Sequence, residues 1–332
     1  MLLALISTLV KPGNSGVLPL FGLIFPYTFI ISCFLVLIVI RYSRIIGLLA
    51  LICMAVNIKS FAAYVRPTLI SPSQEGNLHV LTFNVMMGSR MVNDKYLFGE
   101  AEQKVFTELI QRGPLPHIIC AQEANQLSKQ AFKKAFGESY FHEEEGRGAI
   151  IISKFPIVDK GYVDFGRRLN SCLWADVAIN TKDTVRIYSA HLESNRLRQS
   201  TYEFVNGHNY YADDAVEGIK EFVSNFPKYA GKRADQALDI KMHMAESPYP
   251  VILCGDFNDP PMSFTYRTMK SGLNDTFLDS GSGFGTTWIG AIPMLRIDYI
   301  FASKELKNTA YYCLESDLSD HHPIKASFYL DE

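Results

Sequence analysis

The chain has 332 residues and a formal net charge of −2 at neutral pH, so it lacks the basic excess of proteins that bind nucleic acid mainly by charge. Its length fits one large domain with an appendage. The composition divides the chain in two, because residues 1–65 are overwhelmingly apolar whereas residues 66–332 resemble an ordinary soluble domain.

The apolar N-terminal part predicts a membrane anchor. Val17–Ile40 carries no charge and exceeds the roughly 20 residues that a helix needs to cross the hydrocarbon core of a bilayer. Arg41 and Arg44 follow, and a second apolar stretch, 45–65, reaches spanning length if the Lys59 side chain extends to the membrane surface. We therefore expect a lipid bilayer as a partner, while no sequence feature points to a protein partner.

Met1–Val10 is a third apolar piece, too short to span alone, and we interpret it as the end of a further helix. A cleaved signal peptide is the alternative interpretation of the N-terminus. It is disfavoured because the apolar core of a signal peptide has only about 7–15 residues, and no small-residue cleavage site stands out after Ile40.

The charges that flank the apolar stretches bear on orientation. Arg41 and Arg44 lie in a tight turn and favour a cytoplasmic position for that turn. The remainder of the chain would then be extracytoplasmic, although Lys59 and Arg66 argue weakly for the opposite orientation.

The predicted organisation is a hydrophobic anchor of two to three transmembrane helices over 1–66, a turn-rich linker over 67–77 and a folded domain over 78–332. In the folded domain, short apolar runs alternate with helical patterns, which indicates an α/β fold. The predicted strands are 79–83, 117–121, 149–152, 173–179, 185–190, 251–254, 296–301 and 326–330. The predicted helices are 97–112, 129–136 and 213–246, the last broken near Pro227 and Gly231.

Polar residues with catalytic potential lie at the ends of these strands. Carboxylates at one end of a sheet can hold a hard cation such as Mg²⁺ or Mn²⁺ through oxygen ligands. Histidines can transfer protons or hold a phosphate oxygen, and a carboxylate can activate water. Such a set suits in-line attack of water on a phosphoester. Its members are Asn84, Glu123, His191, Asp256, Asn258, Asp298, Asp320 and His321.

Each member alone is weak evidence. A carboxylate at a strand end is more often a cap or turn residue, and we expect Asp176 and Asp275 to be of that kind. The remaining histidines show no zinc-ligand spacing and are expected to be structural. In the stretch 195–247, the basic residues Arg196, Arg198, Lys232 and Arg233 could contact an anionic substrate, but such charges usually solvate helix faces. Trp288 could line the site or fill the core, and the six cysteines, which include no CxxC pair, are expected to be free thiols.

Seven short motifs occur in a fixed order along the soluble part: TFN at 82–84, QE at 122–123, SKFP at 153–156, HLES at 191–194, GDFN at 255–258, RIDYIF at 296–301 and SDHHP at 319–323. Together they resemble the endonuclease/exonuclease/phosphatase superfamily, also called the deoxyribonuclease I-like fold. The resemblance covers about residues 77–330, and the apolar N-terminus resembles that of bacterial members with membrane anchors.

This resemblance implies an α/β four-layer sandwich, in which two packed mixed β-sheets are flanked by helices, preceded here by N-terminal transmembrane helices. It places the active site at one edge of the sandwich. It also implies a metal ion, Mg²⁺ or Mn²⁺, bound by Glu123 with the help of Asn84 and with Asp320 close by.

The resemblance further implies roles in the reaction. Asp256 would orient or deprotonate the attacking water, and Asn258 would position that water and the phosphate. His321 would contact the scissile phosphate, with Asp298 orienting its imidazole; the next histidine falls at the variable position of the motif. His191 would bind a phosphate oxygen or assist the leaving group.

The predicted function is therefore hydrolysis of a phosphodiester or phosphomonoester by a metal-dependent, membrane-anchored enzyme. Three substrate classes compete: nucleic acid, a phospholipid or lipid-linked phosphate, and a soluble phosphorylated metabolite. A catalytically silent, membrane-tethered binding module of the same fold is the alternative. The complete set of catalytic residue types counts against that alternative.

Overall fold

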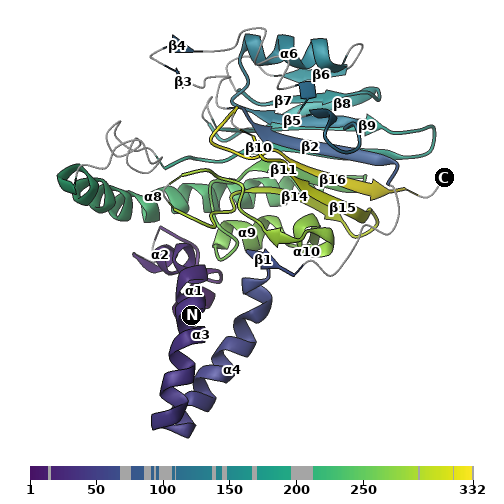
Figure 1. The fold of residues 1–332 in the computed structure, drawn as a ribbon. Helices are drawn as coiled ribbons and strands as arrows, with labels where there is room; N and C mark the ends of the chain where they lie inside the picture. The colour runs from purple at the N-terminus through teal and green to yellow at the C-terminus, as the bar shows by residue number, and fades with distance from the viewer. Residues whose placement is uncertain are drawn as a thin grey trace.

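The computed structural model describes residues 1–13, 16–67, 76–85, 91–92, 95–96, 107–108, 110–136, 140–143, 148–166, 170–195, 212–290, 292–316 and 318–330. Two six-stranded sheets, stacked face to face, form the centre of the molecule (Figure 1). The first sheet has the order β12-β14-β11-β10-β9-β8 and comprises β8 (Ile157–Val163), β9 (Ser171–Ala178), β10 (Thr184–His191), β11 (Val251–Asp256), β12 (Leu273–Asp275) and β14 (Asp298–Ser303). The second has the order β15-β16-β2-β5-β7-β6 and comprises β2 (Leu78–Asn84), β5 (Ile118–Gln122), β6 (Tyr140–Glu143), β7 (Ile150–Ser153), β15 (Lys307–Cys313) and β16 (Ile324–Tyr329).

Both sheets are mixed. Strand β10 is parallel to β11, and β2 is parallel to β5, whereas the other pairs within these two sheets are antiparallel. A parallel pair places the carboxyl ends of both strands at the same edge of a sheet. Asn84 and Gln122, at the ends of β2 and β5, are register partners, as are His191 and Asp256 at the ends of β10 and β11.

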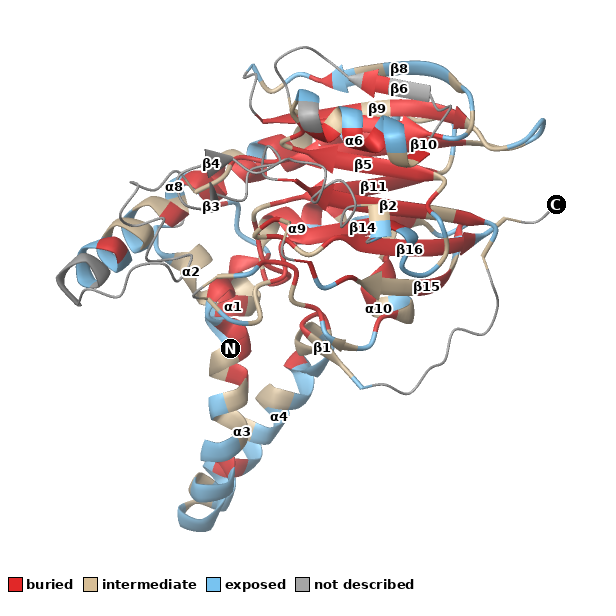
Figure 2. Ribbon diagram, turned by 45° about the horizontal axis from the view of Figure 1, so that its top comes forward, coloured by how far each residue is buried: buried red, intermediate tan, exposed pale blue. Residues whose placement is uncertain are grey.

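The core lies between the sheets, where apolar side chains from both inner faces form one buried cluster that includes Val80, Ile118, Leu173, Ile252 and Ile300. Each outer face is covered by a helix. Helix α6 (Gln126–Phe136) packs Phe132 against the second sheet, and α8 (Ala212–Ala245) packs Ile240 against the first (Figure 2). The four-layer α/β sandwich expected from the sequence is confirmed.

All eight predicted strands are present, with ends that differ by a few residues. Strands β6, β8, β12 and β15 were not predicted. Strand β8 shows why: it is an edge strand whose middle residues, such as Val158 and Lys160, are exposed, so it lacks the apolar run of a buried strand. The predicted helix 97–112 lies largely outside the described residues.

The predicted break in the helix near Pro227 is wrong, because α8 is one continuous helix of 34 residues with Pro227 inside it. Proline removes one backbone hydrogen bond, but the flanking side chain of Phe226 and that of Ala230 are buried, and this packing keeps the helix intact. Close packing explains the glycine at position 231, because a Cβ there would lie 3.3 Å from the Cα of Gly13 in the N-terminal segment.

The apolar N-terminus folds into four helices: α1 (Leu2–Ser7), α2 (Leu18–Leu23), α3 (Phe25–Tyr42) and α4 (Arg44–Phe61). The expected single helix over Val17–Ile40 is therefore divided at Ile24. Pro26 explains the division, since proline has no N–H to bond back to residue 22 but fits the first turn of a new helix. Ser43 caps α4 by accepting a hydrogen bond from the backbone N–H of Ile46.

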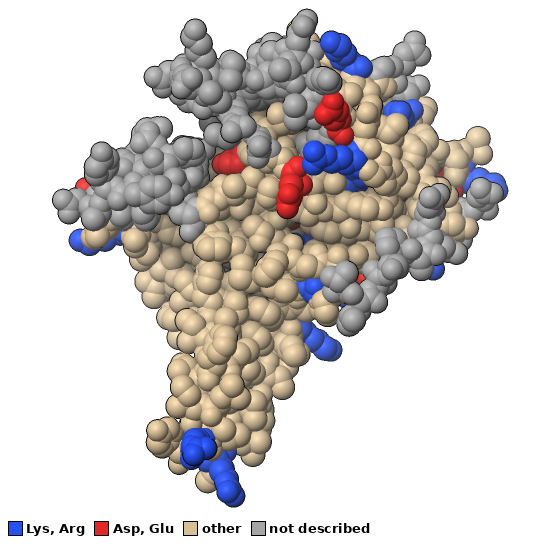
Figure 3. Space-filling view, viewed as in Figure 1, with Lys and Arg blue, Asp and Glu red and all other residues tan. Residues whose placement is uncertain are grey.

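Helices α3 and α4 form an antiparallel hairpin that projects from the sandwich (Figure 1). Each has 18 residues and is long and apolar enough to cross a membrane. Large apolar side chains are exposed along both helices, for example Phe34, Leu37, Ile45 and Val56. On the face seen in Figure 3, Lys and Arg atoms lie at the tip of the hairpin, and the shaft directly above them shows no charged atoms. Within the described part of the chain, no other element covers this apolar surface of α3 and α4.

The base of the hairpin is packed into the sandwich. Arg296, which precedes β14, forms a bidentate ion pair with Asp275 (2.6 and 2.9 Å) and donates a hydrogen bond to the carbonyl of Ala63 (3.1 Å). Both side chains of the pair are fully buried. Next to them, the backbone N–H of Met262 donates to the hydroxyl of buried Tyr64 (3.2 Å). The short strands β1 (Val65–Arg66) and β13 (Gly283–Phe284) continue this junction as an antiparallel pair.

Candidate active site

The polar residues selected from the sequence converge at one edge of the sandwich. Asn84 ends β2, Glu123 directly follows β5, and His191 and Asp256 end β10 and β11. Asp298 begins β14, which is antiparallel to β11, so it pairs directly with Asp256 at the same edge. The alternation of parallel and antiparallel neighbours therefore brings residues from distant parts of the chain together.

The backbone at this edge adopts uncommon conformations. Glu123 and Asn258 both have φ of 53°, and they are two of the three non-glycine residues with positive φ in the described part of the chain. Such a conformation costs on the order of 1 kcal/mol and occurs often at functional sites. Gly255 has φ of 137°, and a Cβ there would lie 1.9 Å from the carbonyl oxygen of Ala190, so only glycine fits between the two strands.

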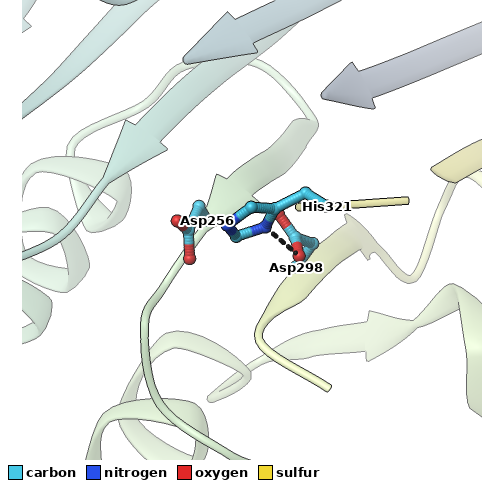
Figure 4. Close-up of side chains that lie close together, drawn as sticks. All are labelled: Asp256, Asp298 and His321. Atoms are coloured by element: carbon cyan, nitrogen blue, oxygen red, sulfur yellow. Dashed lines mark hydrogen bonds and ion pairs between the residues drawn. The ribbon is translucent and has the colours of Figure 1, made fainter. Parts of the chain in front are cut away.

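His321 and Asp298 form a buried pair in the site. The Nδ1 atom of His321 lies 2.9 Å from a carboxylate oxygen of Asp298, and Nε2 lies 3.8 Å from Asp256 (Figure 4). Burial disfavours the imidazolium, but the carboxylates of Asp298, Asp256 and Asp320 outweigh this effect and hold the pKa of His321 well above its usual value. Burial raises the pKa of the Asp298 carboxyl to about 6, although His321 opposes this rise. Each side chain of the pair therefore favours the charged form of the other.

Asn84 lies between two carboxylates. Its Nδ2 donates to Glu123 (3.3 Å) and to Asp256 (3.1 Å). The Nε2 atom of His191 lies 3.6 Å from Glu123 and 3.9 Å from Asp256, and this buried nitrogen has no hydrogen-bond partner among the described residues. A buried polar atom without a partner is costly, and at this edge it indicates a place for a polar ligand atom.

Asn258 fixes the orientation of Asp256. Its backbone N–H donates to one carboxylate oxygen (2.8 Å) and its side-chain amide to the other (3.2 Å). The same amide donates to the carbonyl of Leu192 (3.2 Å), which also accepts from the side chain of Asn170 (2.9 Å). Asp256 is thereby held rigidly, with its Oδ2 directed toward the histidines.

The open side of the site is formed by the loop before β14 and by the SDHHP segment. The indole Nε1 of Trp288 donates to Asp320 (3.4 Å), and Trp288 forms an isolated β-bridge with His321. Ser319 accepts a hydrogen bond from the backbone N–H of His321 and donates to the carbonyl of Asn84. Trp288 therefore lies beside the site, and its ring is also buried in a small apolar cluster with Ile297, so it combines the two roles considered for it.

These observations coincide with the comparisons to known proteins. The model of the Endonuclease/Exonuclease/phosphatase family matches residues 81–321. The chain belongs to this family. No curated protein matches it.

Solved structures of the family share the fold. A family protein from Bacteroides thetaiotaomicron is 17% identical, with a TM-score of 0.56 over 78% of this chain and 100% of its own. A mannosyl-6-phosphatase from the same organism is 17% identical, with a TM-score of 0.53 over 76% and 100% of the two chains. D. rerio TDP2, complexed with a single-strand DNA product, is 18% identical, with a TM-score of 0.54 over 76% and 99%. As a member of this family, the chain is a phosphoester hydrolase, the enzyme class expected from the motifs.

Members of the family generally depend on divalent metal ions, and the residues of this chain fit such an ion. Glu123, Asp256 and Asp320 offer carboxylate oxygens and Asn84 an amide, the ligand types that Mg²⁺ and Mn²⁺ prefer. Asp256, Asp298 and His321 also have ligand atoms within 4.8 Å of one another. Asp298 and His321 are also hydrogen-bonded to each other (2.9 Å).

Within the family fold, some predicted residues have structural roles. Asp176 forms an ion pair with Arg186 (2.6 Å), and Asp275 caps α10 (Thr276–Ser280) in addition to binding Arg296. The imidazole of His322 accepts a hydrogen bond from the backbone N–H of Ser316 (3.4 Å), away from the residues selected for catalysis.

Two of the basic residues of α8, Lys232 and Arg233, bind carboxylates next to the site. Arg233 is fully buried and binds Asp259 (2.9 Å), while Lys232 binds Glu193 of the HLES motif (3.0 Å). The two arginines at 196 and 198 lie outside the described residues. All six cysteines are free, as expected.

The sequence analysis did not select three residues that hydrogen-bond at this site: Asn170, Thr287 and Ser319. A signal for the first was available: Asn170 precedes β9, whose first residue, Ser171, pairs with His191. An antiparallel assignment of these two strands would have placed Asn170 at the catalytic edge. Thr287, which accepts from the N–H of Asp298 (3.0 Å), belongs to a loop without a recognisable pattern.

Proposed function

We propose that this protein hydrolyses a phosphoester by in-line attack of water at the edge formed by β2, β5, β10, β11 and β14. The observation that carries the proposal is the buried His321–Asp298 pair facing Asp256, with Asn84, Glu123 and His191 around it. Asp256 accepts the proton of the water whose oxygen attacks phosphorus, and the ester P–O bond opposite breaks.

The other residues support this step. His321, held as a cation by Asp298, donates to a phosphate oxygen and stabilises the charge of the transition state. Asn258 orients Asp256 and the phosphate. The unpartnered Nε2 of His191 binds a second phosphate oxygen or assists departure of the leaving alkoxide.

The proposed metal ligands are Glu123, Asn84 and Asp320, on the side of the site that is open to solvent. The side chains of Glu123 and Asp320 are 29% and 19% exposed, unlike that of Asp298, which is almost completely buried. Mg²⁺ or Mn²⁺ bound there would neutralise charge on the phosphate and lower the pKa of bound water.

The hairpin α3–α4 inserts into a lipid bilayer in this proposal. Its helices rise about 27 Å, close to the roughly 30 Å of a hydrocarbon core, so their whole length is needed to span. The first turn of α3 then lies at the bilayer surface. In this turn, the hydroxyl of Tyr27 donates to the carbonyl of Pro293, in the loop that joins Trp288 to Asp298. Met294 of the same loop packs into the apolar cluster at the hairpin base.

A loop of the active site would thus rest on the membrane surface, which favours a phosphoester carried by a lipid over nucleic acid. Ile289, next to Trp288 and 40% exposed, adds an apolar side chain at this rim.

The substrate proposal is tested with the full-length protein in lipid nanodiscs with Mg²⁺. Rates are compared for bis(p-nitrophenyl) phosphate and p-nitrophenyl phosphate in solution, for single- and double-stranded DNA, and for phospholipid and polyprenyl phosphate in the disc. We expect kcat/KM to be highest for a lipid in the disc, because the anchor holds the site at the surface where that substrate is concentrated. Tyr27→Phe should lower hydrolysis of the lipid more than that of the soluble esters. Tyr42→Phe, at the far end of the same helix, is the matched control.

The possible outcomes separate the two levels of the proposal. Preference for DNA would overturn the lipid substrate and leave hydrolysis standing. Failure to cleave any ester, with Mg²⁺ and Mn²⁺ both tried, would overturn hydrolysis itself and favour a silent binding module.

The proposed orientation places the catalytic domain outside the cytoplasm, because Arg41 and Arg44 lie at the tip of the hairpin and positive residues favour the cytoplasmic side. A C-terminal alkaline phosphatase fusion, active only outside the cytoplasm, should therefore be active. The corresponding fusion to a fluorescent protein that matures only in the cytoplasm should be dark. The reverse pattern would refute this orientation, and recovery of the full-length chain without detergent would refute the anchor.

A further inference from the structure

A pocket of about 460 Å³ lies where α1, the end of α4 and α9 (Phe264–Met269) meet, at the base of the hairpin. Its volume is in the range of small-ligand sites. Part of its wall is apolar, from side chains that include Leu5 and Met262, and part is basic. The basic lining residues are Lys59, Arg267, Lys270 and Lys304.

The charge of this pocket has one sign. None of its described lining residues is acidic. Lys59, Arg267 and Lys304 are exposed and Lys270 is half-buried, so their charged groups can turn toward a ligand. Asp279 interacts with Lys270 and Arg66 from outside the lining and offsets only part of the positive charge.

The position of the pocket identifies the kind of ligand. Lys59 lies in the last turn of α4, at the opposite end of the hairpin from Arg41 and Arg44. When α3 and α4 span the hydrocarbon core, this turn lies at the level of the lipid headgroups on the side of the catalytic domain. An apolar wall next to four cations at that level matches an anionic phospholipid, whose acyl chains and phosphate are joined in one molecule.

We propose that this pocket binds the headgroup of an anionic phospholipid from the leaflet next to the catalytic domain. The phosphate pairs with the lysine and arginine side chains. The part of an acyl chain nearest the headgroup lies along Leu5 and Met262. None of the pocket residues belongs to the catalytic cluster, so the site does not depend on the proposed hydrolysis. Its effect is to fix the height and rotation of the domain on the membrane.

The test is binding of defined lipids to the detergent-purified full-length protein, measured by native mass spectrometry. Phosphatidylglycerol and phosphatidylcholine with identical acyl chains are titrated, and glycerol phosphate is offered as a soluble competitor. We expect phosphatidylglycerol to bind more tightly than phosphatidylcholine and to resist glycerol phosphate.

The double variant Arg267→Gln/Lys304→Gln removes two exposed cations of the pocket. It should weaken phosphatidylglycerol binding roughly 10- to 30-fold, since each cation near a membrane surface contributes about fivefold. The matched control, Lys160→Gln/Lys182→Gln, removes two exposed cations from the sandwich and should bind like the parent protein.

Unchanged binding in the pocket variant, or equal loss in the control variant, would overturn the proposal. Equal affinity for the two lipids would show that the pocket takes an acyl chain and not an anionic headgroup. Displacement by glycerol phosphate would assign the pocket to a soluble phosphate compound. Circular dichroism of both variants establishes that the fold is retained.

Discussion

Asp256→Asn and His321→Ala are each expected to lower kcat by about 10²- to 10⁴-fold while the fold is retained. Asp256→Asn preserves the shape of the side chain and most of its hydrogen bonds, but an amide cannot accept the proton of the attacking water. His321→Ala removes the imidazole whose protonated form three neighbouring carboxylates favour. Both variants are assayed on p-nitrophenyl esters in the presence of excess Mg²⁺, with urea unfolding as the measure of stability.

Two substitutions far from the site serve as matched controls: Asp159→Asn, on the exposed edge strand β8, and His117→Ala, which precedes β5 at the opposite edge of the sheet. Both should keep near-normal kcat. A near-normal kcat in Asp256→Asn or His321→Ala would instead remove that residue from the proposed chemistry. Asp298→Ala should also reduce kcat. Its loss should overlap with that of His321→Ala in the double variant, because the two side chains act as one hydrogen-bonded unit.

Chelation is expected to abolish hydrolysis. EDTA in excess over contaminating metal should reduce the rate to background, and Mg²⁺ or Mn²⁺ should restore it, because the carboxylates of Glu123 and Asp320 favour such hard cations. Glu123→Gln should raise the Mg²⁺ concentration required for half-maximal activity by tenfold or more. The same titration with Glu305→Gln, an exposed glutamate in the turn before β15, should be unchanged.

Undiminished hydrolysis in EDTA would contradict metal dependence. If Glu123→Gln and the parent protein need the same Mg²⁺ concentration for half-maximal activity, metal dependence stands but Glu123 is excluded as a ligand. In that case the group formed by Asp256, Asp298 and His321 becomes the next candidate.

The residues proposed for catalysis could be selected from the sequence largely because they lie at strand ends. Buried strands such as β11 are short runs of apolar residues, so the first polar residue after them, Asp256, is visible in the sequence. Their convergence could be expected only from the family resemblance, because pairing between β2, β5, β10 and β11 depends on contacts between residues far apart in the chain.

Loops and edge strands could not be predicted in this way. The position of Trp288 depends on a bridge to His321 and on a turn at Met294 with a positive φ of 58°, and neither has a sequence signal. The division of the first apolar stretch at Ile24 was missed because hydropathy counts length and does not register Pro26 as the start of a new helix.

The Arg296–Asp275–Ala63 junction has a practical consequence for protein production. A truncated chain that begins after the hairpin loses the carbonyl that accepts from Arg296 and the hydroxyl that accepts from Met262. It also uncovers the apolar surface that Phe25, Phe29 and Tyr64 bury. An exposed patch of that kind promotes aggregation in water. A soluble, crystallisable form of this enzyme is therefore better sought by polar redesign of the exposed shaft of α3 and α4 than by cutting the anchor away.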